Sequence, residues 1–309
     1  MTIGIPRALL YYKYGVLWET FFRRLGCDVV LSPPTNASIL RDGDDHSVDE
    51  SCVPSKIYMG HVKALMGNCD LILVPRIESF GPHGDVCVKF NALGDIVRNT
   101  LPEAPLICYN VDAGRGAGER AGFIGMGREL GKRRAETKRA YERAQAAQLR
   151  ADSARAKEQE RILNDGDAVK ILLVSPPYNI HDRLIGRPVV EAVEAQGAVP
   201  VFADALDGPA CAAKASEISD HLYWLYSREL VGAAALCRDR VDGILLVTAF
   251  PCGPDSLVNE LLMRRIKGLP VAHILLDELN CEAGILTRIE SFVDIIRHRK
   301  SDEGKGHTA

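Results

Sequence analysis

The chain has 309 residues, of which 47% are hydrophobic and 26% are charged, and its net charge at pH 7 is −3. This length is enough for about two domains with cores of their own. The balanced charge gives no indication of a nucleic-acid or membrane surface, so we expect neither as a partner. No apolar run approaches the ~20 residues of a spanning helix, and MTIGIPRALL does not resemble a signal peptide. We therefore expect a cytoplasmic protein whose nine cysteines are reduced thiols or metal ligands.

Strands and helices alternate along the first part of the chain, which is typical of a parallel α/β sheet. Gly26 gives the first helix a C-terminal stop, and Pro54 is typical of the first turn of a helix. The expected strands are 2–5, 28–31, 70–74 and 105–109, and the expected helices are 12–25, 54–66 and 88–99.

The middle of the chain, 118–164, is rich in Ala, Arg, Glu and Lys and predicts one or two long helices. Its apolar stripe is thin, and its basic run at 132–134 is interpreted as a solvated helix face rather than a nucleic-acid site. We interpret this segment as a connector that also makes contacts; a dimerisation or partner-docking arm is the alternative.

The remainder repeats the strand–helix pattern of the first part, with VDGILLVTAF corresponding to CDLILVPRIESF. Expected helices are 184–196 and 221–237, and expected strands include 199–202, 243–250 and 270–276. The predicted fold is therefore α/β, with two facing Rossmann-like parallel-sheet domains joined by a long helical arm. The expected domains are 1–117, the connector 118–165, a second domain 166–299, and a flexible tail 300–309.

Three cysteines stand in loops where such a fold exposes its backbone: Cys52, Cys87 and Cys252. Cys52 and Cys252 each precede a predicted helix, whose N–H groups and dipole stabilise a thiolate. There is no CxxC pair, which argues against zinc ribbons and thioredoxin-like sites. Three thiolates would suit an iron–sulfur cluster with one exchangeable iron.

The other cysteines divide between core and undecided positions. Any single cysteine is more often a small core side chain than a ligand, and this interpretation suits the ones in apolar runs. Cys27 is undecided, and Cys281 could be a further ligand. The interpretation as core residues applies to Cys69, Cys108, Cys211 and Cys237.

Two residues after Cys52 are candidates for chemistry. Lys56 could stabilise a thiolate or an anionic ligand, or it could be a surface lysine. His61 could act as an acid or base or stabilise a cluster sulfide, or it could be a hydrogen-bonded core histidine.

The segment PCGPDS combines a strand end with a helix start. Gly253 allows close approach, and Asp255 or Ser256 can cap the helix, which predicts a cradle for an anion or cofactor. The alternative is an ordinary tight loop at the ligand-binding edge of a sheet.

Polar residues also follow two other predicted strands. In PPYNIHD, Tyr178, Asn179, His181 and Asp182 could line a cleft or simply form a turn. Around the last strand, Asp277, Glu278 and Glu282 could transfer protons, with Glu278 the preferred candidate, or form an ion-pair network with Arg288.

Several strings, taken together, resemble a known family. IGIPRAL, ESCVPSK, LILVPRI, PPYNIHD, PCGPDS and DELNCEAGILTRIESF are similar to the uncharacterised domain associated with acyl-CoA dehydratase activases. That domain is related to the iron–sulfur subunits of 2-hydroxyacyl-CoA dehydratases and to double-cubane cluster proteins. The resemblance spans nearly the whole chain except the 118–164 segment.

The resemblance implies Rossmann-like domains that hold a cubane-type cluster, 4Fe–4S or double cubane. It implies that Cys52 and Cys252 are ligands and, on looser flanking residues, Cys87. It also implies a separate ATP-hydrolysing activator of the actin/sugar-kinase fold, a second dehydratase-like subunit and an acyl-CoA substrate.

Two functional hypotheses follow. The first is an iron–sulfur protein for low-potential electron transfer or reductive radical chemistry, as a 2-hydroxyacyl-CoA dehydratase-like lyase or a cluster-dependent reductase component. The second is a non-catalytic binding or assembly module of a dehydratase–activase system, with a structural metal or none.

Overall fold

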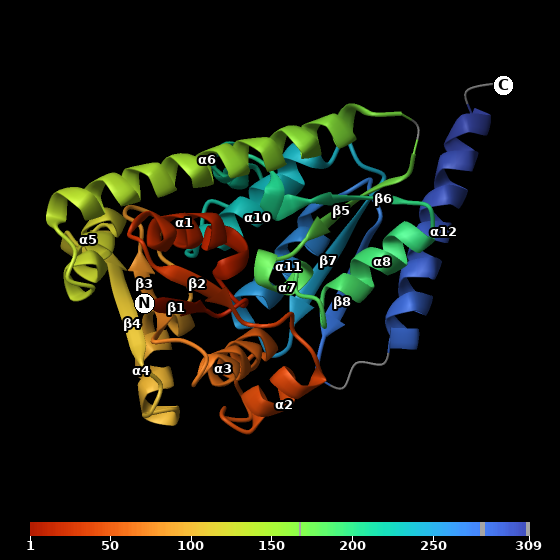
Figure 1. Ribbon diagram of the computed structural model, residues 1–309. Coiled ribbons are helices and arrows are strands. Elements are labelled where there is room, and N and C mark those ends of the chain that lie inside the picture. Colours follow the sequence, from red (N-terminus) through yellow and green to blue (C-terminus); the bar gives the residue numbers. More distant parts are fainter. Residues whose placement is uncertain (167, 279–281, 307–309) are drawn as a thin grey trace. The chain divides into compact units, whose positions relative to one another are not determined.

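The computed structural model describes residues 1–166, 168–278 and 282–306 of the chain. It contains two four-stranded sheets in which every pairing is parallel, surrounded by helices (Figure 1). The predicted α/β fold with two Rossmann-like parallel-sheet domains is thereby confirmed. The chain forms two compact units: unit 1 is Met1–Ser153 with Tyr223–Leu225, and unit 2 is Ala154–Leu222 with Tyr226–Ala309.

The sheet of unit 1 has the order β2-β1-β3-β4. Its strands are β1 (Thr2–Ile5), β2 (Asp28–Leu31), β3 (Leu71–Ser79) and β4 (Leu106–Asp112). The first two have the predicted bounds. The other two run further than predicted at their carboxyl ends, where six consecutive residues of β3 pair with β4 before the register shifts.

The helices of unit 1 are α1 (Tyr11–Arg24), α2 (Ala37–Asp44), α3 (Val53–Leu65), α4 (Val88–Thr100) and α5 (Glu119–Glu129). None of the helices expected from the sequence covers α2. Its N-cap, Asn36, accepts hydrogen bonds from the N–H groups of Ser38 and Ile39. α1 and α5 share an aromatic core with β4, in which Trp18 Nε1 donates to the Tyr109 hydroxyl at 2.8 Å.

The sheet of unit 2 has the order β6-β5-β7-β8, the same as that of unit 1. Its strands are β5 (Lys170–Val174), β6 (Val199–Phe202), β7 (Gly243–Ala249) and β8 (Val271–Leu276). Every residue of β7 is buried, as expected of a central parallel strand with both faces covered.

The helices of unit 2 are α7 (Pro177–Ile180), α8 (Arg187–Ala195), α9 (Gly208–Lys214), α10 (Leu225–Cys237), α11 (Gly253–Arg265) and α12 (Glu282–Gly306). α10 begins four residues later than predicted, because the chain before it is irregular and Leu225 N donates to Asp85 O at 2.8 Å. α12 extends through the start of the segment predicted to be a flexible tail. Short 3-10 turns occur at Ala113–Arg115, Ala203–Ala205 and Ala215–Glu217.

The predicted connector contains one long helix, α6 (Arg134–Asn164), which the two units share. In unit 1 the Gln148 side chain accepts from Leu17 N at 3.0 Å and donates to Lys13 O at 2.9 Å. In unit 2 the Gln159 side chain accepts from Phe202 N at 2.8 Å. Each part of the helix is thus fixed to its own unit by an amide side chain.

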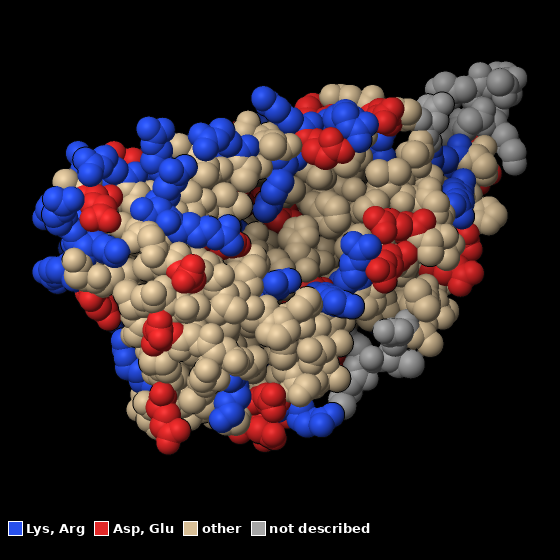
Figure 2. Space-filling model, in the orientation of Figure 1, with Lys and Arg blue, Asp and Glu red and all other residues tan. Residues whose placement is uncertain are grey.

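Lys and Arg side chains gather over α5 and the first part of α6 (Figure 2). Residues 128–150 contain eight Lys or Arg and three Asp or Glu, in a chain whose net charge is −3. Among the helices that the structure describes, none is long and apolar enough to cross a membrane.

α2 and α3 pack with their backbones in contact, and this contact positions the helix that follows Cys52. A Cβ atom on Gly60 would lie 1.9 Å from Ile39 O, and one on Gly43 would lie 1.9 Å from Lys56 O. Neither backbone can move aside as a flexible side chain would.

We therefore expect Gly60→Ala to lower the free energy of unfolding by about 1–3 kcal/mol, because the added methyl group forces the two helices apart. The matched control is Gly125→Ala in α5, where a Cβ atom meets nothing within 4 Å. There, helix propensity alone predicts a gain of about 0.5–1 kcal/mol. Urea unfolding of both variants measures the difference, and equal effects would contradict this packing.

Candidate functional site

The two sheets share a strand order that marks a ligand-binding edge. In each sheet, the second strand of the chain lies on one side of the first strand, and the third strand lies on its other side. The strand order therefore reverses between the two central strands. Ligands of open α/β sheets bind outside the carboxyl ends of the strands at this switch point. In unit 1 the point lies between β1 and β3, and in unit 2 between β5 and β7.

Cys52 and Cys87 lie at helix N-termini in unit 1. Cys52 is the N-cap residue of α3 and Cys87 that of α4, and each is half-buried. Neither side chain makes a capping hydrogen bond to its helix. Lys89 Nζ donates to Ser51 Oγ at 3.3 Å, which brings the two cysteine-bearing segments together.

A cavity of about 680 Å³ lies beside these segments in unit 1. Ser51 and Ser55, which flank Cys52, line it, together with Lys89, two residues after Cys87. The segments that contain the two cysteines therefore adjoin a hollow large enough for a small ligand, although neither cysteine lines it.

Lys56 is buried, and its ammonium group is engaged by a carboxylate. Its Nζ lies 2.7 Å from Asp44 Oδ1, with 5% of the lysine side chain and 49% of the aspartate side chain exposed. This pair ties α3 to the end of α2. Its predicted role in stabilising a thiolate or anion stays a prediction.

His61 is completely buried in a hydrogen-bonded network. Its Nδ1 lies 2.7 Å from Ser32 Oγ and its Nε2 lies 2.9 Å from Thr35 Oγ1. Burial, with a smaller effect of the Arg7 charge, lowers the pKa of His61 to about 3. The imidazole is therefore neutral at physiological pH, as the interpretation as a core histidine expects, and its role as an acid or base stays a prediction.

In unit 2, Cys252 is likewise a half-buried N-cap residue, at the start of α11. Ser256 Oγ donates to Cys252 O at 2.7 Å, so this serine secures the first turn through the backbone. A Cβ atom on Gly253 would meet nothing within 4 Å. The helix start is thus open on the side of Gly253.

Asp255 and Asn179 form a buried polar pair beside Cys252. Burial raises the pKa of Asp255 to about 6, and hydrogen bonding by Cys252 and Asn179 opposes that rise. Asp255 Oδ2 and both side-chain heteroatoms of Asn179 are nevertheless buried without a well-formed hydrogen bond. The sequence placed Asn179 in a motif after β5, but it did not show that this residue meets Asp255.

The other polar residues of PPYNIHD have structural contacts. The His181 Nε2 atom lies 3.0 Å from Asp204 Oδ2, which Arg155 also approaches, at 3.1 Å. Asp182 Oδ1 accepts from Leu184 N at 2.8 Å, a turn role that the sequence left open.

At the end of β8, Asp277 Oδ1 accepts from the N–H of Glu278 at 2.6 Å. The described residues end at Glu278 and resume at Glu282. Cys281 lies outside them, and the proton-transfer role of Glu278 stays a prediction.

Burial changes the thiol pKa of four of the remaining cysteines. It raises the pKa of the thiol in Cys27, Cys69 and Cys108, and in Cys237 it raises the pKa to about 11. These side chains remain thiols at neutral pH, in keeping with the interpretation of Cys69, Cys108 and Cys237 as core residues. Cys27, which the sequence left undecided, is buried.

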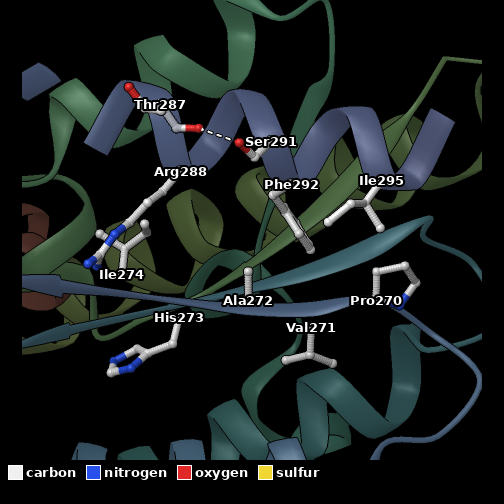
Figure 3. A pocket seen from close by; sticks show the side chains of 10 residues that line it. All are labelled: Pro270, Val271, Ala272, His273, Ile274, Thr287, Arg288, Ser291, Phe292 and Ile295. Atoms are coloured by element: carbon white, nitrogen blue, oxygen red, sulfur yellow. Dashed lines mark hydrogen bonds between the residues drawn. The ribbon is translucent and has the colours of Figure 1, made fainter. Parts of the chain in front are cut away.

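A second cavity, of about 500 Å³, lies in unit 2 between the edge strand β8 and α12. Ala272 and Ile274 point toward the helix, where Phe292 and Ile295 lie (Figure 3). None of the predicted site residues lines this cavity.

The donor chemistry of the three cysteines fits an iron–sulfur cluster, because each is partly accessible, outside any disulfide, and at a helix N-terminus. Within the residues that the structure describes, no three or more His, Cys, Asp or Glu side chains are gathered so that they could hold a metal ion.

Comparison with known proteins identifies the family. Residues 2–206, about two thirds of the chain, match the family described as the CoA enzyme activase uncharacterised domain. The chain belongs to this family. The predicted resemblance to an activase-associated domain is confirmed, and this family is associated with CoA enzyme activase systems.

None of the curated proteins matches this activase-associated chain. Among solved structures, the crystal structure of ZnuA is similar at 12% sequence identity and a TM-score of 0.28. The match covers 96% of the activase-associated chain and 98% of ZnuA.

The contrast among the thiols predicts their order of reaction. In the native protein we expect iodoacetamide to alkylate Cys52, Cys87 and Cys252 before Cys27 and Cys237, because the latter are buried and, by the raised pKa, protonated. Mass spectrometry of peptides from a time course measures this order. Equal rates in native and denatured protein would contradict it.

The network around His61 predicts a pH dependence of stability. Because the folded pKa of about 3 lies below the ordinary histidine pKa of 6.5, the unfolded chain binds the proton more readily. Stability is therefore present above pH 6.5 and is lost as the pH falls toward 3. Between pH 7 and pH 5 the wild type should lose about 2 kcal/mol more than His61→Gln, which does not titrate. Parallel urea titrations at the two pH values test this, and parallel pH profiles would contradict it.

Proposed function

We propose that this activase-associated protein binds an iron–sulfur cluster through Cys52, Cys87 and Cys252. The observation that supports the proposal is that each of the three cysteines is the N-cap residue of a helix and has a partly exposed side chain. Cys52 and Cys87 belong to unit 1 and Cys252 to unit 2. The proposed activity is low-potential electron transfer or a reductive radical reaction.

The residues of the chain supply charge balance at such a site. The first N–H groups of α3, α4 and α11 and the positive ends of their dipoles favour thiolates and a negatively charged cluster. In unit 2, hydrogen bonding by Cys252 opposes the rise in the pKa of Asp255, which indicates that this carboxyl group lies beside the Cys252 thiol. When bound, the cluster would supply one-electron chemistry and a Lewis-acidic iron.

The proposed partner is an ATP-hydrolysing activator of the actin/sugar-kinase fold that donates electrons, since the family is associated with CoA enzyme activase systems. On this proposal the substrate is an acyl-CoA, and the reaction is similar to 2-hydroxyacyl-CoA dehydration. A second dehydratase-like subunit completes the proposed assembly.

The alternative proposal is a binding or assembly module of the same system. It is favoured by the basic surface over α5 and the first part of α6, which is unusual for a chain of net charge −3. On this alternative the cysteines hold a structural metal or none, and the basic surface docks a partner.

Iron and acid-labile sulfide analysis of protein purified without oxygen tests the proposal. We expect about four irons and four sulfides per chain and an EPR signal after dithionite reduction. Serine variants of Cys52, Cys87 or Cys252 should lose most of both. Cys237→Ala, in the buried core of unit 2, is the control and should retain them.

A folded protein without iron, or serine variants with undiminished iron, would overturn the cluster proposal. If that iron-free protein still bound an activator, the binding module would be favoured. Appreciably more than four irons would indicate a double cubane.

A further inference from the structure

Arg7 occupies the switch point of unit 1, at the end of its central strand. It follows β1 (Thr2–Ile5) by two residues, and β1 pairs with β2 on one side and with β3 on the other. A side chain that leaves this strand end lies at the edge where parallel sheets receive their ligands.

The backbone at Arg7 is firmly held, but its side chain is not. Arg7 N donates to Ser32 Oγ at 2.8 Å, and Ser32 in turn contacts His61 Nδ1 at 2.7 Å. The next residues, Ala8, Leu9 and Leu10, are buried at 2–4% exposure. The guanidinium is thus carried on a rigid loop.

The backbone of that loop is strained at a residue other than glycine. Leu9 has a φ of +47°, the left-handed region that side chains other than glycine rarely adopt. Such strain persists only where the surroundings over-determine the conformation, and it is concentrated at functional sites. Here it orients the segment that carries Arg7.

The guanidinium of Arg7 has no partner in the described part of the chain. Its Nε is buried and makes no hydrogen bond, and no described carboxylate lies within ion-pair distance of the side chain. The neighbouring His61 is neutral, and the neighbouring Tyr11 hydroxyl donates to Glu19 at 3.2 Å. A half-buried cation without a counter-charge is costly to a folded protein.

We propose that Arg7 binds the oxyanion of a ligand, a carboxylate or a phosphate, at the switch point of unit 1. The rigid fork of N–H donors in arginine matches both groups. A ligand oxyanion would satisfy the buried Nε and neutralise the charge, which accounts for a cation held where the protein itself offers no partner. The inference does not depend on the cluster, because no thiolate and no iron is part of it.

The first test is calorimetric titration of the full-length protein with inorganic phosphate and, separately, with propionate, at constant ionic strength against chloride. We expect at least one of the two to bind, and the comparison tells phosphate from carboxylate. Arg7→Met should weaken that binding at least tenfold. Arg24→Met, at the exposed end of α1, is the matched control and should leave binding unchanged.

The melting temperature separates binding from a structural role. Ligand-free Arg7→Met should melt at or above the wild-type temperature, because the substitution removes an uncompensated charge. A lower melting temperature with unchanged anion affinity would overturn the proposal, as would a wild type that binds neither anion.

A second measurement uses no variant. Phenylglyoxal modifies accessible arginines, and the binding anion should protect Arg7 but not Arg24, as peptide mass spectrometry would show. Equal modification of Arg7 with and without the anion would contradict the proposal. Iron content measured on the same samples keeps the outcome separate from that of the cluster proposal.

Discussion

Parallel pairing of the central strands is the constraint on which the rest of this structure depends. When β1 pairs with both β2 and β3, every strand of the sheet ends at the same edge, and every following helix must begin there. The same holds for β5 with β6 and β7. Helix N-termini, with their unsatisfied N–H groups, are therefore gathered at one edge of each sheet. The cysteines at the starts of α4 and α11, the helices that follow β3 and β7, take their chemical character from that placement.

The sequence predicted the strands and most helix starts because local signals decide them. β1, β2 and β6 have the expected bounds, and the proline after Cys52 correctly indicates the start of α3. α2 was missed because its signal is a single N-cap asparagine in a polar stretch that reads as a loop. Its position is fixed by close backbone contact with α3, a tertiary interaction that no local pattern contains.

The candidate site was predictable in its residue types but not in its environments. The motif around Cys252 indicated a cradle, yet the burial of Asp255 against Asn179 joins residues from two separate segments. The ammonium group of Lys56 was expected to stabilise a thiolate or an anion. It forms an ion pair with Asp44 on α2, a helix that the sequence did not predict. Arg7 was part of a quoted motif, and only the packing around it shows that its guanidinium lacks a partner.

The shared helix α6 has a consequence for how the protein unfolds. Residues 134–153 of this helix belong to unit 1 and residues 154–164 to unit 2, while its hydrogen-bond ladder runs without interruption through the boundary. Helix formation is cooperative, and a terminus left by the loss of one half frays into the other. Loss of structure in one unit therefore removes support from a helix on which the other depends. The two sheets have separate cores, but their unfolding is coupled through this helix. Local opening in one unit should therefore lower the hydrogen-exchange protection of backbone amides in the other.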